Sequence, residues 1–137
     1  MAQDGTTDVL FRYHAPNERT APQYEAIRAA EKILQDVFNA IGGGIAVNYE
    51  MVNGSIAALY QRLPATCELL GRDVDMHVHA LDLQARASIA LARNAANEAI
   101  ATREDVPRLL AIARTKVQEA RWAMCGIVAI LDAVTHP

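Results

Sequence analysis

The fold of this chain is decided by residues 104–134, which read EDVPRLLAIARTKVQEARWAMCGIVAILDAV. Apolar residues recur there at steps of three and four, a spacing that predicts one long helix with a continuous buried seam. The seam consists of Leu110, Ala113, Val117, Ala120, Met124, Ile127, Leu131 and Val134. Residues 122–134 include a single charged side chain, so we expect this half of the helix to be covered on every side, in part by another copy of the protein.

The composition indicates a single helical domain over residues 1–137. Apolar residues make up 52% of the chain, many of them alanine, while aromatic residues make up 5%. Such a chain favours helices packed at close distance, and its length suffices for a hydrophobic core. We therefore predict an all-α fold with a helical hairpin of two long antiparallel helices, an N-terminal helix and shorter helices. Residues 1–9 are expected to form a mobile arm.

The first helix is predicted to follow Thr20 as its N-cap and to run to about Ala40. Pro22 and Glu25 suit a first turn. The three glycines at residues 42–44 end the helix and allow a change of direction. Its predicted buried stripe is Ile27, Ala30, Leu34, Val37 and Ile41.

The middle of the chain leaves alternatives open. Residues 45–52 fit a short strand, an extended link or the start of a helix, and residues 53–55 read as a turn or a cap. We predict a short helix over residues 55–62, stopped by Pro64, with a further turn or two over residues 65–70.

A second long helix is predicted over residues 73–102. Thr102 is then expected to be the N-cap of the last helix, with Glu104, Asp105 and Pro107 in its first turn. The predicted stripe of the second long helix is Val74, Val78, Leu81, Ala85, Ser88, Ala92, Ala95 and Ala99. Its small residues would let a neighbouring helix approach closely.

Net charge and cysteine content restrict the compartment and the partners. The net charge is −3, so the chain lacks the basic surface that polymeric nucleic acid requires, whereas a few arginines suffice for a small anion. No segment has the roughly 18 to 20 apolar residues of a membrane span, and the polar N-terminus lacks a signal core. Cys67 and Cys125 read as small buried residues in a reducing compartment rather than as a disulfide. We expect a cytoplasmic protein without membrane association.

No pattern of catalytic or metal-binding residues is evident. His77 and His79 are two apart on a helix and point in different directions, which does not suit one metal ion. Carboxylates on facing helices, which a magnesium-dependent nucleotide hydrolase of helical-bundle type needs, are not apparent. Residues 42–44 lack the Lys-Ser/Thr of a phosphate loop. We therefore expect no enzyme activity, no metal and no cofactor, and an unusual hydrolase stays open as an alternative.

The basic residues are better candidates for a binding site. Arg28 and Lys32 are four apart on the first helix and share one face. Arg108 lies in the first turns of the last helix, where backbone N–H groups also favour anions, and Arg114 and Arg121 share another face of that helix. For each of them the alternative is an ordinary solvated charge. The available acidic partners are Glu31, Glu104 and Glu119.

Phe11, Tyr13 and His14 precede the first helix in a segment without an obvious partner. They fit two roles, which are stapling the N-terminal arm onto the helices and stacking on a nucleobase. Their spacing leaves both roles open.

Two segments of the chain resemble a known family. Residues 11–16, FRYHAP, precede a helix with Tyr24, Ile27 and Arg28, and the closing segment carries Lys-Val-x-Glu-Ala-x-Trp-Ala at residues 116–123. Together they resemble the phage anti-CBASS and Thoeris anti-defence sponge family, whose members share a helical hairpin domain. The resemblance lies at the two ends of the chain and leaves residues 42–101 as an insertion relative to the compact family core.

The resemblance implies a protein that binds signals of bacterial immunity without cleaving them, and so blocks CBASS or Thoeris signalling. The signals are cyclic di- or oligonucleotides or cyclic ADP-ribose isomers. The resemblance also implies homo-oligomers, from dimers up to hexamers, with ligand pockets between protomers in the host bacterial cytoplasm. It assigns ligand binding to Phe11, Tyr13, His14, Arg28, Lys32 and Arg108. The alternative is a small helical protein-interaction module that acts through its apolar C-terminal helix.

Overall fold

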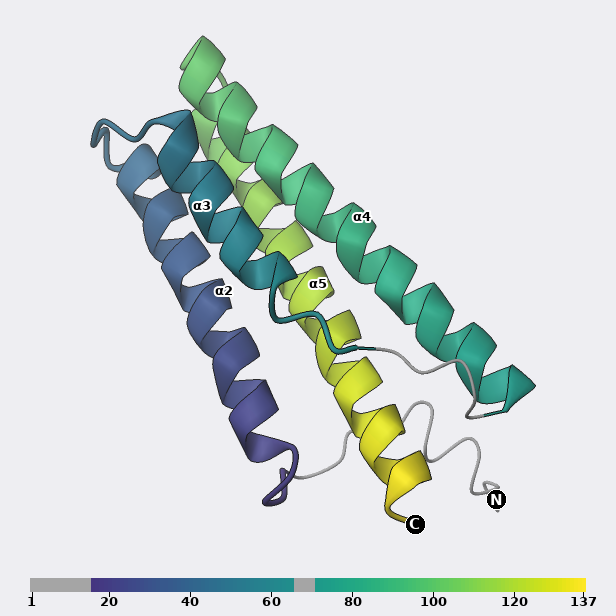
Figure 1. Cartoon of the computed structure of the whole chain (residues 1–137). Coiled ribbons are helices and arrows are strands. Elements are labelled where there is room, and N and C mark those ends of the chain that lie inside the picture. The colour runs from purple at the N-terminus through teal and green to yellow at the C-terminus, as the bar shows by residue number, and fades with distance from the viewer. Residues whose placement is uncertain (1–15, 66–70) are drawn as a thin grey trace, which may run out of the picture.

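The structure, a computed structural model, describes residues 16–65 and 71–137. Within these residues the chain forms helices only, which confirms the all-α prediction. In order they are α2 (Ala21–Gly42), α3 (Tyr49–Tyr60), α4 (Arg72–Thr102) and α5 (Val106–Thr135) (Figure 1). None of the described helices combines the length and the apolarity that a membrane span needs.

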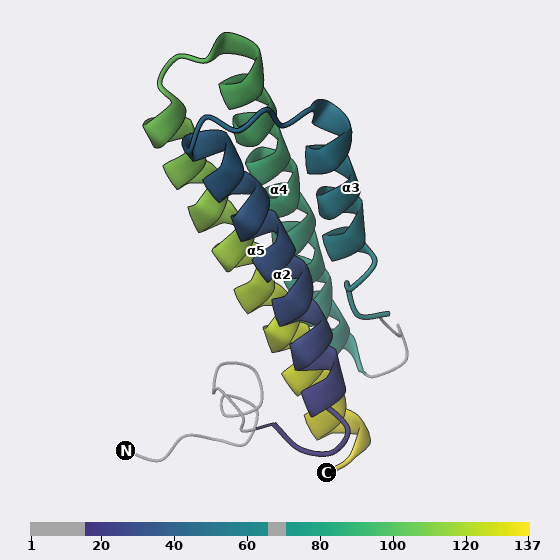
Figure 2. The same ribbon diagram turned by 90° about the vertical axis from the view of Figure 1, so that its left-hand side faces the viewer.

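The two longest helices, α4 and α5, run side by side in opposite directions, as Figure 1 and Figure 2 both show. They make the most extensive helix–helix contact in the described part of the chain. Small residues dominate the buried positions of α4, which allows a close approach of the two backbones. Gly126 of α5 lies against α4, where a Cβ atom in its place would lie 3.3 Å from Leu81 Cδ1. The small buried residues of α4 are Ala85, Ser88, Ala92, Ala95, Ala96 and Ala99.

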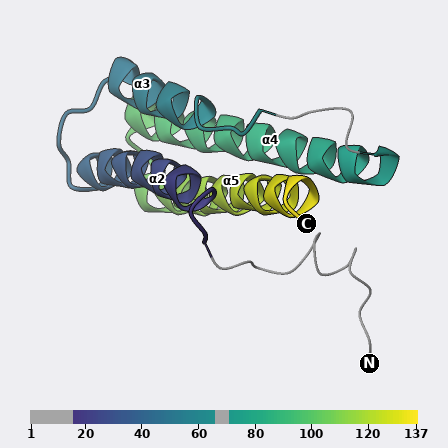
Figure 3. The same ribbon diagram turned by 60° about the horizontal axis from the view of Figure 1, so that its bottom comes forward.

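The other two helices complete a bundle in which each helix packs against two main neighbours. α2 packs on α5 and α3, and α3 packs on α2 and α4 (Figure 3). α2 runs antiparallel to α5, because Gly42 at its end lies against Leu110 while Arg19 before its start reaches Asp132. The largest fully buried side chains come from all four helices and include Leu34, Phe38, Leu59, Ile89, Leu110, Met124 and Ile127.

The three long helices agree with the prediction. α2 follows Thr20 and ends at the glycines, α4 begins one residue earlier than expected, and α5 begins two residues later. Most predicted stripe residues are buried. The exceptions lie towards helix ends and are partly buried: Val37, Ile41, Val74, Leu131 and Val134.

Three local predictions are wrong. Residues 53–55 do not form a turn but lie inside α3, because the helix starts earlier, at Tyr49. Its N-cap is Asn48, whose side-chain oxygen accepts a hydrogen bond from Met51 N at 2.9 Å. That helix also ends at Tyr60 rather than at residue 62. Thr102 does not cap α5, since it is the last residue of α4 and its hydroxyl donates to the Glu98 carbonyl at 2.9 Å. The cap position belongs to Asp105.

The C-terminal half of α5 was expected to need cover from a second copy of the chain, and this expectation changes. In the C-terminal half of α5 the apolar side chains of Met124, Ile127, Val128 and Ile130 are buried within one chain. They therefore need no cover from another protomer. The predicted N-terminal arm, the turn over residues 65–70 and Cys67 fall largely or wholly outside the described residues.

The corner between α4 and α5 holds two residues in the left-handed backbone region. Arg103 has φ +56° and Asp105 has φ +52°. Arg103 directly follows the last helical residue of α4, a position where glycine is the usual choice because it has no Cβ. The arginine side chain is thus carried at a conformational cost of about 1 kcal/mol.

Arg103→Gly is expected to raise the free energy of unfolding by about 0.5–1 kcal/mol, because the gain from relieving the left-handed backbone exceeds the added entropy of the unfolded chain. Urea unfolding measures the change. A matched control is Gln118→Gly, at an exposed position in the middle of α5. This change should lower the free energy of unfolding by about 1 kcal/mol. Equal destabilisation by both glycines would contradict the corner geometry.

A polar cluster fastens the start of α2 to the end of α5. Arg19 Nε donates to Asp132 Oδ1 at 2.6 Å, and Asn17 Nδ2 donates to Asp132 Oδ2 at 2.9 Å. The hydrogen bond from Arg19 lowers the pKa of Asp132 below its ordinary value, against the opposing effect of burial.

The lowered pKa of Asp132 predicts a pH dependence of stability. The ionised carboxylate stabilises the folded state above its unfolded pKa of about 4, and this stabilisation is lost as the pH falls through the lower folded-state pKa. Asp132→Asn should therefore unfold at a lower urea concentration than the parent at pH 7. This difference in urea midpoint should vanish below the folded-state pKa of Asp132. Asp36→Asn, which removes an exposed ion pair, should change little at either pH. A constant difference across the acid range for Asp132→Asn would refute the linkage.

Candidate ligand-binding site

The structure does not bring the predicted binding residues together within one chain. Arg28 and Lys32 are exposed on α2, and Arg108 is exposed in the first turn of α5. The charge of Arg28 acts on Cys125, so Arg28 lies beside the C-terminal half of α5. Seventeen residues of helix separate Cys125 from Arg108, which amounts to about 25 Å. Phe11, Tyr13 and His14 lie outside the described residues.

Two of the predicted cations have carboxylate partners, one on the same helix and one at the residue that precedes the helix. Lys32 Nζ lies 3.2 Å from Asp36 Oδ2, and Arg108 Nη2 lies 3.5 Å from Asp105 Oδ2. All four side chains are mostly exposed, and such ion pairs are weak. For Lys32 and Arg108 the structure therefore matches the description of ordinary solvated charges.

Arg28 differs from them, because it makes no hydrogen bond or ion pair with any residue that the structure describes. Its neighbours along the contact between α2 and α5 are two further arginines. Arg121 Nε lies 2.9 Å from Glu31 Oε2, and Arg114 Nη2 donates to Asn39 Oδ1 at 2.9 Å. Arg114, Arg121 and Arg28 therefore follow one another along one side of the α2–α5 contact, which we call the α2/α5 face.

The Glu31–Arg121 pair is the most buried ion pair of this face. The Glu31 side chain is only 15% exposed. Its Oε2 atom and the Nε atom of Arg121 have no hydrogen-bond partner beyond their mutual approach among the described residues. A half-buried charge without its partner is costly, so this pair holds α2 and α5 in register.

Trp122 is the aromatic residue of this region that the sequence interpretation missed. It lies midway between the seam residues Ala120 and Met124, so helix geometry turns it away from the core. Its exposure is 66%, the largest among the large apolar side chains described. The position of Trp122 relative to the seam predicts an exposed side chain. The low charge of residues 122–134 suggested burial instead.

Cys125 lies one turn beyond Arg121 and is half-buried. Burial raises the pKa of its thiol, although the nearby charges of Arg121 and Arg28 act in the opposite direction. A raised pKa keeps the group as a thiol at neutral pH, which does not suit a cysteine nucleophile.

Two shallow hollows lie at the ends of the α2/α5 face. One, of about 340 Å³, is lined by Asn39, Gly42, Val106, Pro107, Leu110 and Arg114. The other, of about 280 Å³, is lined by Asn17, Thr20, Tyr24, Ala129, Asp132, Ala133 and His136. In residues 16–65 and 71–137 no three histidine, cysteine or acidic side chains lie close enough to share a metal ion. His77 is partly buried and His79 is exposed.

The Glu31–Arg121 pair predicts strong energetic coupling. Glu31→Met and Arg121→Met should each lower the free energy of unfolding by about 1–3 kcal/mol, because each leaves one half-buried charge unpaired. The double variant should lose less than the sum of the two. Urea unfolding of the four proteins measures the coupling, with Lys32→Met as an exposed-pair control that changes stability by less than about 0.5 kcal/mol. Strictly additive losses would show that the two side chains do not interact.

Comparisons of the chain with protein-family models, with curated proteins and with solved structures found no match in any of the three.

Proposed function

We propose that this protein binds small cyclic nucleotide signals on the α2/α5 face without cleaving them. By removing cyclic di- or oligonucleotides or cyclic ADP-ribose isomers, it would block antiphage signalling of the CBASS or Thoeris type in the bacterial cytoplasm. The observation that supports this function is the unpaired Arg28 beside Arg121 and Cys125, with the exposed Trp122 on the same helix.

The chemistry of such a ligand fits these groups. A cyclic dinucleotide presents two phosphodiester charges and two flat bases. A guanidinium without a partner pairs with a phosphate, because its N–H groups match two oxygens at once. An exposed indole offers a stacking surface that any base can use. The net charge of −3 keeps polymeric nucleic acid away while a local pair of cations attracts a small dianion.

A homo-oligomer would complete the site. In one chain the α2/α5 face is open, and its hollows are shallow. A second copy across a two-fold axis supplies a second Arg28 and a second Trp122, which matches the near two-fold symmetry of a cyclic dinucleotide. In this proposal Phe11, Tyr13, His14, Lys32 and Arg108 contact the ligand from the same or another protomer, in assemblies from dimers to hexamers.

The remaining helices have a supporting role in this proposal. In this proposal α4 and α5 correspond to the helical hairpin expected from the sequence. α3 and nearly all of α4 fall within the proposed insertion over residues 42–101, and they pack on α2 and α5 respectively. They stabilise the α2/α5 face without contributing ligand contacts.

A specific observation favours a protein-interaction module as the second candidate. Apolar side chains recur at steps of three and four along an exposed side of α4: Met76, Ala80, Leu83, Ala87 and Leu91. A partner helix could bury such a stripe. In this alternative the partner binds α4, because most of the apolar residues of the C-terminal helix, where an interaction was predicted, are already buried.

Ligand depletion tests the function. Purified protein is mixed with a panel of cyclic dinucleotides, cyclic trinucleotides and cyclic ADP-ribose isomers, removed by filtration and then denatured by heat. We expect one ligand to disappear from the filtrate and to return intact on denaturation. Arg28→Ala and Trp122→Ala should each weaken its binding about tenfold or more, because each removes a charged contact or a stacking surface.

Arg62→Ala is the matched control, since Arg62 is an exposed arginine at the end of α3 away from the face. It should deplete the ligand as the parent does. Ligand that returns cleaved would identify a hydrolase. The absence of depletion by the parent protein would shift the assignment to the protein-interaction module, and unchanged binding by Arg28→Ala would refute the site.

A further inference from the structure

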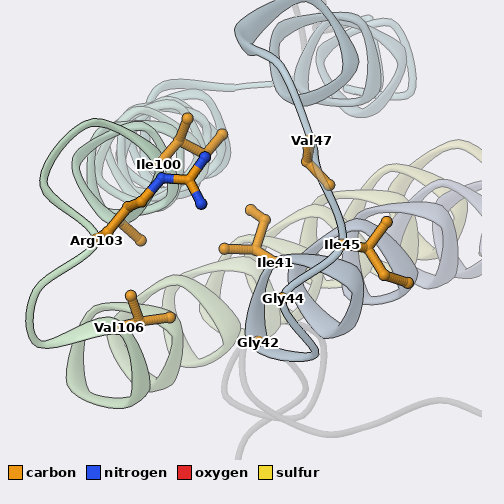
Figure 4. Close-up of a pocket in the computed structure, with 9 residues that line it drawn as sticks. Ile41, Gly42, Gly44, Ile45, Val47, Ile100, Arg103 and Val106 are labelled. Atoms are coloured by element: carbon orange, nitrogen blue, oxygen red, sulfur yellow. The ribbon is translucent and has the colours of Figure 1, made fainter.

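A separate hollow lies at the end of the bundle where the loop after α2 meets the corner between α4 and α5 (Figure 4). Its volume is about 240 Å³. Aliphatic side chains from four segments form most of its wall: Ile41, Ile45, Val47, Ala99, Ile100 and Val106. The hollow is smaller than the roughly 300–1,000 Å³ of pockets for drug-sized ligands, so it suits a small apolar group.

Ile45 is the most exposed of the large aliphatic residues that line the hollow. Its side chain is 64% exposed, although it belongs to a predominantly aliphatic hollow. The backbone of Gly44 places it there, with φ +78°, a conformation that other residues rarely adopt. Figure 4 shows the Ile45 side chain directed away from Ile41 and Arg103, so an apolar chain in the hollow would rest on Ile41, Ile100 and Val106.

Arg103 provides the only charged group in the wall of this hollow. Figure 4 shows its guanidinium beside Ile100, at the edge of the hollow. It makes no hydrogen bond or ion pair with any described residue. Of the nearest acidic residues in sequence, Asp105 pairs with Arg108, and Glu104 hydrogen-bonds through its backbone to the Thr102 hydroxyl.

The left-handed backbone of Arg103 brings this cation to the hollow. A glycine would satisfy the same corner without strain, and yet the position carries a long cationic side chain. An unpaired guanidinium at the rim of an aliphatic hollow matches a molecule with an aliphatic body and a carboxylate end. The two oxygens of a carboxylate suit one planar guanidinium, which pairs with both of them.

We propose that this hollow binds a medium-chain aliphatic carboxylate, with its chain against Ile41, Ile100 and Val106 and its carboxylate on Arg103. The site is distinct from the α2/α5 face, and it does not depend on the function proposed for Arg28 and Trp122. Binding would also fix the corner between α4 and α5.

Octanoate titration into protein with labelled isoleucine methyl groups tests the proposal. We expect saturable chemical-shift changes at Ile41 and Ile100. Ile33 and Ile112, which are exposed elsewhere, should not shift and serve as internal controls for non-specific association. Octanol, which has the same chain without the charge, should bind about tenfold more weakly or worse.

Arg103→Gly separates binding from folding, because this change is expected to stabilise the protein while it removes the cation. It should weaken octanoate binding about tenfold or more, a loss that cannot be assigned to unfolding. Arg108→Gln, a neighbouring exposed arginine outside the hollow, should bind octanoate as the parent does. Equal octanoate affinity in Arg103→Gly and parent, equal affinity for octanol, or shifts spread over Ile33 and Ile112 would each overturn the proposal, as would the absence of shifts.

Discussion

The close contact between α4 and α5 is the constraint on which the rest of the structure depends. Alanine and serine occupy most of the buried positions of α4, and Gly126 leaves space for the larger Leu81 on the facing helix. Each small side chain buries little apolar surface, so the pair depends on many short-range contacts along two helices of 31 and 30 residues. A bulky residue in this seam would separate the helices over several turns.

The contact also determines what the other side of α5 offers. With one side of α5 against α4 and a second side against α2, only a third side stays open. Trp122 lies on it, because its position two residues from the seam leaves no other direction. The Glu31–Arg121 and Arg19–Asp132 pairs then place α2 so that Arg28 comes beside Cys125. Core packing thus brings an unpaired cation and an exposed indole to neighbouring helices.

The sequence predicts the long helices well, because apolar spacing over several turns is a strong signal. The stripe from Val78 to Ala99 is buried as expected, and glycines follow the first helix. The short helix was harder to place, since residues 45–55 mix glycine, asparagine and aliphatic residues that suit several conformations. The hydrogen bond from Met51 N to the Asn48 side chain decides its start.

The candidate site was less predictable than the fold. Spacing along one helix shows that Arg28 and Lys32 share a side, but it does not show which residue of another helix lies opposite them. The approach of Arg28 to Cys125 and the distance of Arg108 both follow from the antiparallel packing of α2 on α5, which is a tertiary property. Trp122 was missed because the low charge around it suggested burial on every side.

Native mass spectrometry of the protein mixed with the cyclic nucleotide panel tests the central claim most directly, because one spectrum reports both the assembly and the mass of what it holds. We predict a homo-oligomer that retains one of these nucleotides at its intact mass. A monomer that carries no nucleotide, or an assembly that carries only a hydrolysed product, would contradict the account.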